Sequence, residues 1–123
     1  MIRRDYEYEQ VEFISKLLYT ILFPQKSKKF NINDYKFDTR SLELKLDLMD
    51  LIKNNKFNDA EDMLFEHIAE DERENRGNGS LRVAVWFYLQ LNHIDKETLE
   101  ANDFSRREVL EGIQEIEQKA MNS

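Results

Sequence analysis

The scarcity of helix-breaking residues is the feature that most limits how this chain can fold. Only three glycines and one proline occur among its 123 residues. A β-rich fold needs frequent tight turns, which these two residues usually supply, so their scarcity favours long helices. The sequence therefore predicts an all-α fold, an antiparallel helical bundle of five to six helices with mostly short connections. The length suits one domain, and we predict a single helical domain over residues 1–123.

Apolar residues recur at three- and four-residue steps in the segments expected to be helical. A first helix is predicted over about 5–23, ended by Pro24. A long loop over about 24–38 follows it. The third predicted helix starts near residue 57 or 58, where Asn58 and Glu61 resemble a capping pair.

Turn and capping signals divide the second half of the chain. The stretch 77–80 (Gly-Asn-Gly-Ser) predicts a turn, with Ser80 as the N-cap of a fourth helix. A short helix is predicted over about 95–101. The last helix is expected to begin at a capping box formed by Ser105 and Glu108.

Two segments fit a strand as well as a helix. In the predicted second helix, about 39–54, leucines alternate with charged residues from 42 to 48, but leucine and its charged neighbours are helix formers rather than β-branched residues. Wound as a helix, this segment has one narrow polar stripe, which predicts a central helix packed on two sides. The run 83–89 has no polar break, and we expect a helix because no β partner is evident elsewhere.

The charge balance and the absence of cysteine exclude several functions. Acidic residues outnumber basic ones by 25 to 18, which disfavours non-specific nucleic-acid binding. The chain has no cysteine, so thiolate catalysis and cysteine-bound metals are excluded. No apolar stretch approaches the roughly 20 residues needed to cross a bilayer, and no secretory signal is evident. We expect a cytoplasmic protein, and the amino-acid usage suggests a bacterial source.

No catalytic, cofactor-binding or metal-binding residues are predicted, and no cofactor. The two histidines, His67 and His93, lack the spacing of a helical-bundle metal site. The third helix is expected to carry an acidic solvent-facing surface, which in an alternative interpretation attracts a basic partner. Its members are Asp59, Glu61, Asp62, Glu66, Glu70, Asp71, Glu72 and Glu74.

Lysines alternate with aromatic residues in the long loop, a pattern that can contact single-stranded nucleic acid or another anion. The lysines are Lys26, Lys28, Lys29 and Lys36, and the aromatic residues are Phe30, Tyr35 and Phe37. The simpler interpretation is a solvated connection whose aromatic side chains fold back onto the bundle.

Consecutive aromatic residues in the fourth helix point in different directions, so either this helix is fully surrounded or one flank is an interface. The candidate interface residues are Val85, Trp86, Tyr88 and Leu89. A ligand pocket near Trp86 is the alternative use of the same residues.

The segment 55–64 resembles the middle of a tetratricopeptide (TPR) repeat, in which an aromatic residue and an alanine three positions later join two antiparallel helices. Here those positions are Phe57 and Ala60, followed by Leu64. No second copy of the pattern occurs. The resemblance implies a TPR-like central helical hairpin.

The whole chain resembles a bacterial family of small all-helical proteins of unknown function. The resemblance lies in residues 2–6 (Ile-Arg-Arg-Asp-Tyr), the hairpin 48–64 and the stretch 104–110 (Phe-Ser-Arg-Arg-Glu-Val-Leu). It implies the fold class and no activity.

The sequence therefore leads to a non-enzymatic helical protein-interaction module, which binds a protein partner or forms a homo-oligomer. A small-molecule-binding domain or an enzyme with a pocket near Trp86 is the alternative. Anion or nucleic-acid contact through the lysine-rich loop is a weaker one.

Overall fold

A computed structural model of the chain describes residues 5–23, 32 and 35–122, and within them it contains six helices and no strand. The helices are α1 (Tyr6–Leu22), α2 (Thr39–Lys53), α3 (Phe57–Glu74), α4 (Gly79–Asn92), α5 (Lys96–Ala101) and α6 (Arg106–Met121). The predicted all-α fold is confirmed, and both ambiguous segments are helices. In this part of the chain no helix combines the length and apolar character that crossing a membrane requires.

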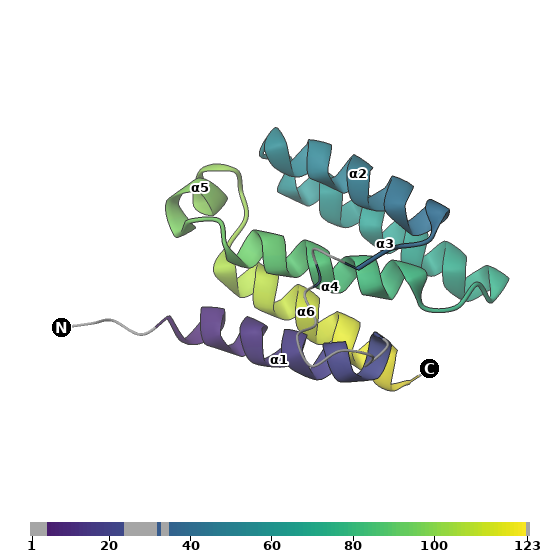
Figure 1. Cartoon of the computed structure of the whole chain (residues 1–123). Coiled ribbons are helices and arrows are strands. Elements are labelled where there is room, and N and C mark those ends of the chain that lie inside the picture. Colours follow the sequence, from purple (N-terminus) through teal and green to yellow (C-terminus); the bar gives the residue numbers. More distant parts are fainter. Residues whose placement is uncertain (1–4, 24–31, 33–34, 123) are drawn as a thin grey trace.

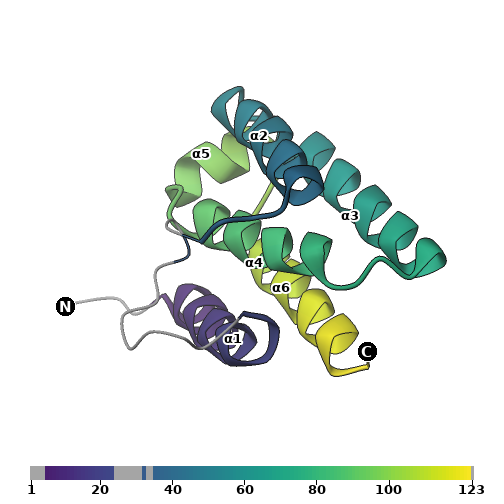
Figure 2. The same cartoon turned by 45° about the vertical axis from the view of Figure 1, so that its right-hand side comes forward.

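Helix α4 lies at the centre of the molecule. It packs against α1 and α6 on one side and against α2 and α3 on the other (Figure 1). Figure 2 shows the same order, with α1 and α2 on opposite sides of α4. Neighbours joined by short connections run antiparallel, as predicted, but α1 and α6 lie side by side and run in the same direction (Figure 1).

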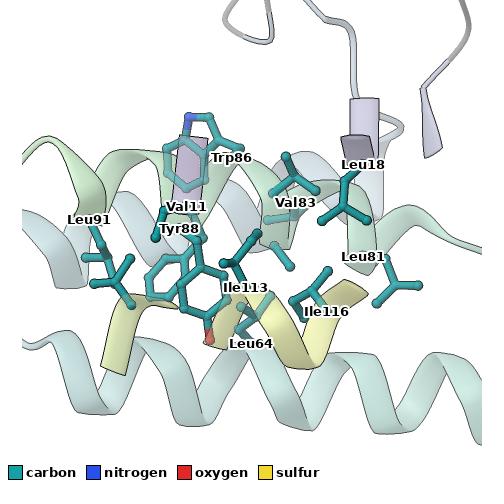
Figure 3. Close-up of a cluster of buried hydrophobic side chains, with 14 of the residues drawn as sticks. Val11, Leu18, Leu64, Leu81, Val83, Trp86, Tyr88, Leu91, Ile113 and Ile116 are labelled. Carbon is teal, nitrogen blue, oxygen red and sulfur yellow. The ribbon is translucent and has the colours of Figure 1, made fainter. Parts of the chain in front are cut away.

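The side chains of α4 form the middle of the core. All six residues from Val83 to Tyr88 are buried, although they point in every direction around the helix. Figure 3 shows side chains of α4 together with Val11 and Leu18 from α1 and Ile113 and Ile116 from α6. A helix without a polar face is stable in water only when it is covered on all sides, and the four long helices around α4 provide that cover.

Side-chain caps fix the start of four helices, but two predicted caps are absent. Ser105 caps α6 as predicted, accepting a hydrogen bond of 3.1 Å from the Glu108 backbone N–H. Asn58 caps nothing, because its side chain donates instead to the Asp103 carbonyl at 3.0 Å. Ser80 is not an N-cap either, because α4 already begins at Gly79.

The prediction that the second helix is central was wrong. Helix α2 lies on the outside, where Leu42, Leu46 and Met49 are exposed while Leu44 and Leu48 are buried. Its apolar residues cover two faces, as the sequence indicated, but only one of these faces meets the rest of the described chain. The pattern alone cannot say whether the second face packs within the chain.

Helices α4 and α6 approach closely at Gly112. A Cβ atom there would lie 2.3–2.4 Å from the Cε1, Cζ and hydroxyl oxygen of Tyr88. The missing side chain lets the Tyr88 ring cross α6 and reach α3, where its hydroxyl donates to Glu61 at 2.6 Å. Glycine in a helix costs about 1 kcal/mol relative to alanine, so its place here is explained by this contact.

Gly112→Ala is expected to lower the free energy of unfolding by about 1–3 kcal/mol, because overpacking outweighs the gain in helix propensity. Urea denaturation followed by circular dichroism measures the change. Gln114→Ala, on the exposed side of the same helix, serves as the control and should change it by less than about 0.5 kcal/mol. A Gly112→Ala protein more stable than the wild type would contradict this account of the contact.

Candidate functional site

The candidate interface on the fourth helix lies inside the protein. Val85, Trp86 and Tyr88 are buried, and Leu89 is partly buried against the core. The Lys45 ammonium lies 5.3 Å from the ring centroid of Trp86, so α2 covers this side of the indole. These four residues therefore pack between helices, and little of their surface is accessible to a partner.

The predicted anion-binding loop lies mostly outside the described residues, which include neither Lys26, Lys28, Lys29 nor Phe30. Lys36 is described and is exposed. Tyr35 and Phe37 pack against the core, with their ring centroids 4.8 Å apart in an edge-on arrangement. For these two aromatic residues the simpler interpretation, folding back onto the bundle, is confirmed.

The two histidines lie on different elements and have different partners. His67 is partly buried on α3, and its Nδ1 lies 3.1 Å from the Met63 carbonyl oxygen. His93 follows α4 and is exposed, with its Nε2 3.1 Å from a Glu12 carboxylate oxygen. Within the described ranges, no three acidic or histidine side chains are grouped in a way that could hold a metal ion.

A buried carboxylate joins three helices near the turn between α3 and α4. Asp71, only 7% exposed, accepts hydrogen bonds from the Arg40 guanidinium at 3.0 and 3.3 Å. The Ser80 hydroxyl donates to its other oxygen at 2.5 Å. Because both carboxylate oxygens have partners, the burial of this charge is compensated, and the cluster fixes the starts of α2 and α4 against the end of α3.

A hollow of about 370 Å³ lies beside this cluster and extends to the end of α6. Ile68 and Leu81 form its apolar part, and Glu72 and Lys119, which also line it, form an ion pair of 3.0 Å. The charged groups that line this hollow are paired within the protein, so the hollow has little uncompensated charge.

A second hollow of about 370 Å³ separates α3 from α6 and is strongly acidic. Its lining residues are Glu61, Asp62, Phe65, Glu108, Glu111, Gly112 and Glu115. Burial raises the pKa of the Glu61 carboxyl above its usual value, the nearby acidic groups raise this pKa further, and the hydrogen bond from Tyr88 opposes them. Burial also raises the pKa of the Tyr88 hydroxyl, which remains protonated and donates to Glu61.

The outer face of α1 carries apolar side chains that point away from the core. Tyr6 and Phe13 are 70% and 69% exposed, Ile21 is also exposed, and Leu17 is partly exposed. We call Tyr6, Phe13, Leu17 and Ile21 the outer α1 stripe. A hollow of about 490 Å³ lies between its first two members and is lined by Tyr6, Glu9, Gln10 and Phe13.

The outer face of α2 carries a second such surface, on the far side of the molecule from α1 (Figure 2). Leu42, Leu46 and Met49 are 42–54% exposed and follow one another at steps of four and three residues. This spacing places them on one face of the helix. We call them the outer α2 stripe.

Sequence reasoning placed Asp71 and Glu61 on a solvated acidic face, and this was wrong for both. Asp71 is buried and Glu61 is partly buried. A signal existed for Asp71, because it continues the three- and four-residue spacing of the buried residues Phe57, Ala60, Leu64 and Ile68. The close approach at Gly112 was missed too, although an isolated glycine in a helix often has a packing reason.

Asp71→Asn is expected to reduce the free energy of unfolding by about 1–3 kcal/mol, because the Arg40 guanidinium loses its charged acceptor. Asp62→Asn makes the same chemical change at an exposed position of α3 and should change it by less than about 0.5 kcal/mol. Both are measured by urea denaturation. Equal stability of the two variants would show that the Asp71 cluster does not hold the helices together.

The pKa of Glu61 is higher in the folded than in the unfolded chain, so its contribution to stability is complete at low pH and is lost as the pH rises through its folded-state pKa. Glu61→Gln keeps an acceptor for Tyr88 but cannot ionise. Relative to the wild type, this variant should become more stable as the pH rises from about 4 to about 7, because its side chain has no proton to lose. Urea denaturation at both pH values tests this, with the exposed Glu66→Gln as the control. A gain of the same size in the control would contradict the assignment to Glu61.

Comparison with known proteins identifies a family but no activity. No curated protein and no solved structure matches the chain. The sequence model of one family, described as a family of unknown function (DUF6483), matches residues 1–121. The match covers nearly the whole sequence, which agrees with the resemblance to a family of all-helical proteins of unknown function. The chain therefore belongs to the DUF6483 family.

Proposed function

We propose that this protein is a non-enzymatic helical protein-interaction module that binds other helices through its two outer stripes. The observation that supports the proposal is that α1 and α2 each carry apolar side chains on two faces. On each helix one face packs into the core, while the other, the outer stripe, is exposed.

Single exposed apolar residues are common on soluble proteins and need no explanation. The members of the outer stripes differ from such residues because they recur at helical spacing along one face. A partner helix that lays its own apolar face along such a surface makes contacts at the same spacing. The outer α2 stripe also belongs to the α2–α3 hairpin, which is the segment that resembles a TPR repeat.

The acidic hollow between α3 and α6 and the Asp71 cluster do not compete with this role. Both contain polar groups whose partners lie within the protein, and both join neighbouring helices. A rigid bundle held in this way presents its outer helices in a fixed orientation, which lowers the entropic cost of binding.

The test is affinity capture from the source cell with the purified protein as bait, followed by quantitative mass spectrometry. The Leu46→Glu/Met49→Glu bait is expected to capture the proteins that the wild type enriches in amounts at least about 10-fold lower, because the variant places charge in an apolar contact. Gln114→Glu/Gln118→Glu adds the same charge to exposed positions of α6 and should capture what the wild type captures.

Circular dichroism first establishes that all three baits have the same helix content. Capture of the same proteins in the same amounts by all three baits would refute a role for the outer α2 stripe.

A further inference from the structure

A row of carboxylates runs beside the outer α2 stripe. Glu43, Asp47 and Asp50 each come one residue after a member of the stripe, so they repeat its steps of four and three residues. Because successive residues of a helix are about 100° apart around its axis, all three carboxylates lie along the same flank of the stripe. We call these three residues the acidic α2 row.

The charges of the acidic α2 row are not compensated by the rest of the described chain. All three side chains are exposed, and no ion pair or side-chain hydrogen bond joins any of them to a described residue. The carboxylates of Glu70 and Asp71 on α3 differ in this respect, because the Arg40 guanidinium pairs with them at 3.7 and 3.0 Å. Three uncompensated charges in a line produce a negative potential, which favours a partner with cations at the same spacing.

Two of the three basic residues on α2 are engaged away from this row. Arg40 is paired with α3. Lys45 lies on the opposite flank of the stripe, with its ammonium 5.3 Å from the ring centroid of Trp86. Lys53 lies in the last turn of α2, where the stripe ends. The exposed face of α2 therefore combines an apolar stripe with an acidic flank.

A second copy of this chain does not provide the matching cations on either of its outer stripes. The outer α1 stripe belongs to a helix with a single basic residue, Lys16. On α2, only Lys53 is not engaged with another part of the described chain. The partner that fits this surface is therefore a different protein, in which a helix has an apolar face and a row of lysine or arginine residues along one flank.

We propose that the outer α2 stripe and the acidic α2 row together bind an amphipathic helix of another protein, whose apolar face is flanked by lysine or arginine residues. The inference rests on the proposed interaction role and names the chemistry of the partner of one stripe. From Leu42 to Met49 the stripe is about 10 Å long, so the contact covers about two turns of each helix. An apolar contact of this length suits reversible binding, and the charges beside it discriminate between partners.

The first test uses two synthetic peptides as probes, each designed as an amphipathic helix of about 18 residues with the same leucine face. One peptide carries lysine along a flank of this face, and the other carries glutamate at the same positions. Fluorescence anisotropy measures their binding to the full chain. The wild type should bind the lysine peptide at least about 10-fold more tightly, because ion pairs that are individually weak replace repulsions along the whole row. Added salt should reduce this preference, because it screens exposed charges.

Glu43→Gln/Asp47→Asn/Asp50→Asn removes the charge of the acidic α2 row and leaves the apolar stripe unchanged. This variant should bind the lysine peptide about 10-fold more weakly than the wild type and should lose most of the preference between the two peptides. Leu46→Ala keeps the row and shortens the stripe, so it should weaken the binding of both peptides by a similar factor.

A matched control removes the same number of charges elsewhere. Asp62→Asn/Glu111→Gln/Glu115→Gln changes three exposed residues beside the acidic hollow between α3 and α6. It alters the net charge of the chain as much as neutralising the row does, and it should keep the wild-type preference for the lysine peptide. Circular dichroism checks that each variant is folded.

Equal binding of the two peptides by the wild type would overturn the proposal. A preference that survives neutralisation of the acidic α2 row, or that is lost in the control, would overturn it as well. The affinity capture separates this inference from the proposed function. Proteins that are lost with Leu46→Glu/Met49→Glu but retained after neutralisation of the row would leave the proposed function standing and refute a basic partner.

Discussion

The burial of α4 on every side is the constraint on which the rest of the structure depends. From Val83 to Tyr88 this helix offers water no polar face, and its apolar surface contributes to stability only where other helices remove it from solvent. One neighbouring helix covers only part of its circumference. Four long helices surround it, two on each side.

Polar groups at the helix contacts complement this apolar core. The Tyr88 hydroxyl crosses α6 at Gly112 to reach Glu61, and Asp71 joins the ends of three helices through Arg40 and Ser80. Apolar side chains of similar size can slide past one another at small cost, whereas a buried polar group loses its partner when the helices shift. These contacts therefore fix the register in which the helices around α4 pack.

The same architecture leaves α1 and α2 on the outside, on opposite sides of α4. Each of them has more apolar surface than one packing contact can use. The candidate site that we propose therefore lies on the two outer helices, and not on the helix with three consecutive aromatic residues, Trp86 to Tyr88, that they cover. The DUF6483 family is described as one of unknown function, and the proposed role in protein interaction is argued from the surface of this chain alone.

The sequence by itself determined the all-α class, most helix boundaries and the capping of α6 at Ser105, because these depend on neighbouring residues and on a repeat of three to four positions. It also showed that the second and fourth helices are apolar on more than one face. Only the tertiary structure decided which of the two is central, because the residue pattern of a helix does not record how many neighbours it has. For the same reason the burial of Asp71 and the exposure of Phe13 became known only when the helices were packed.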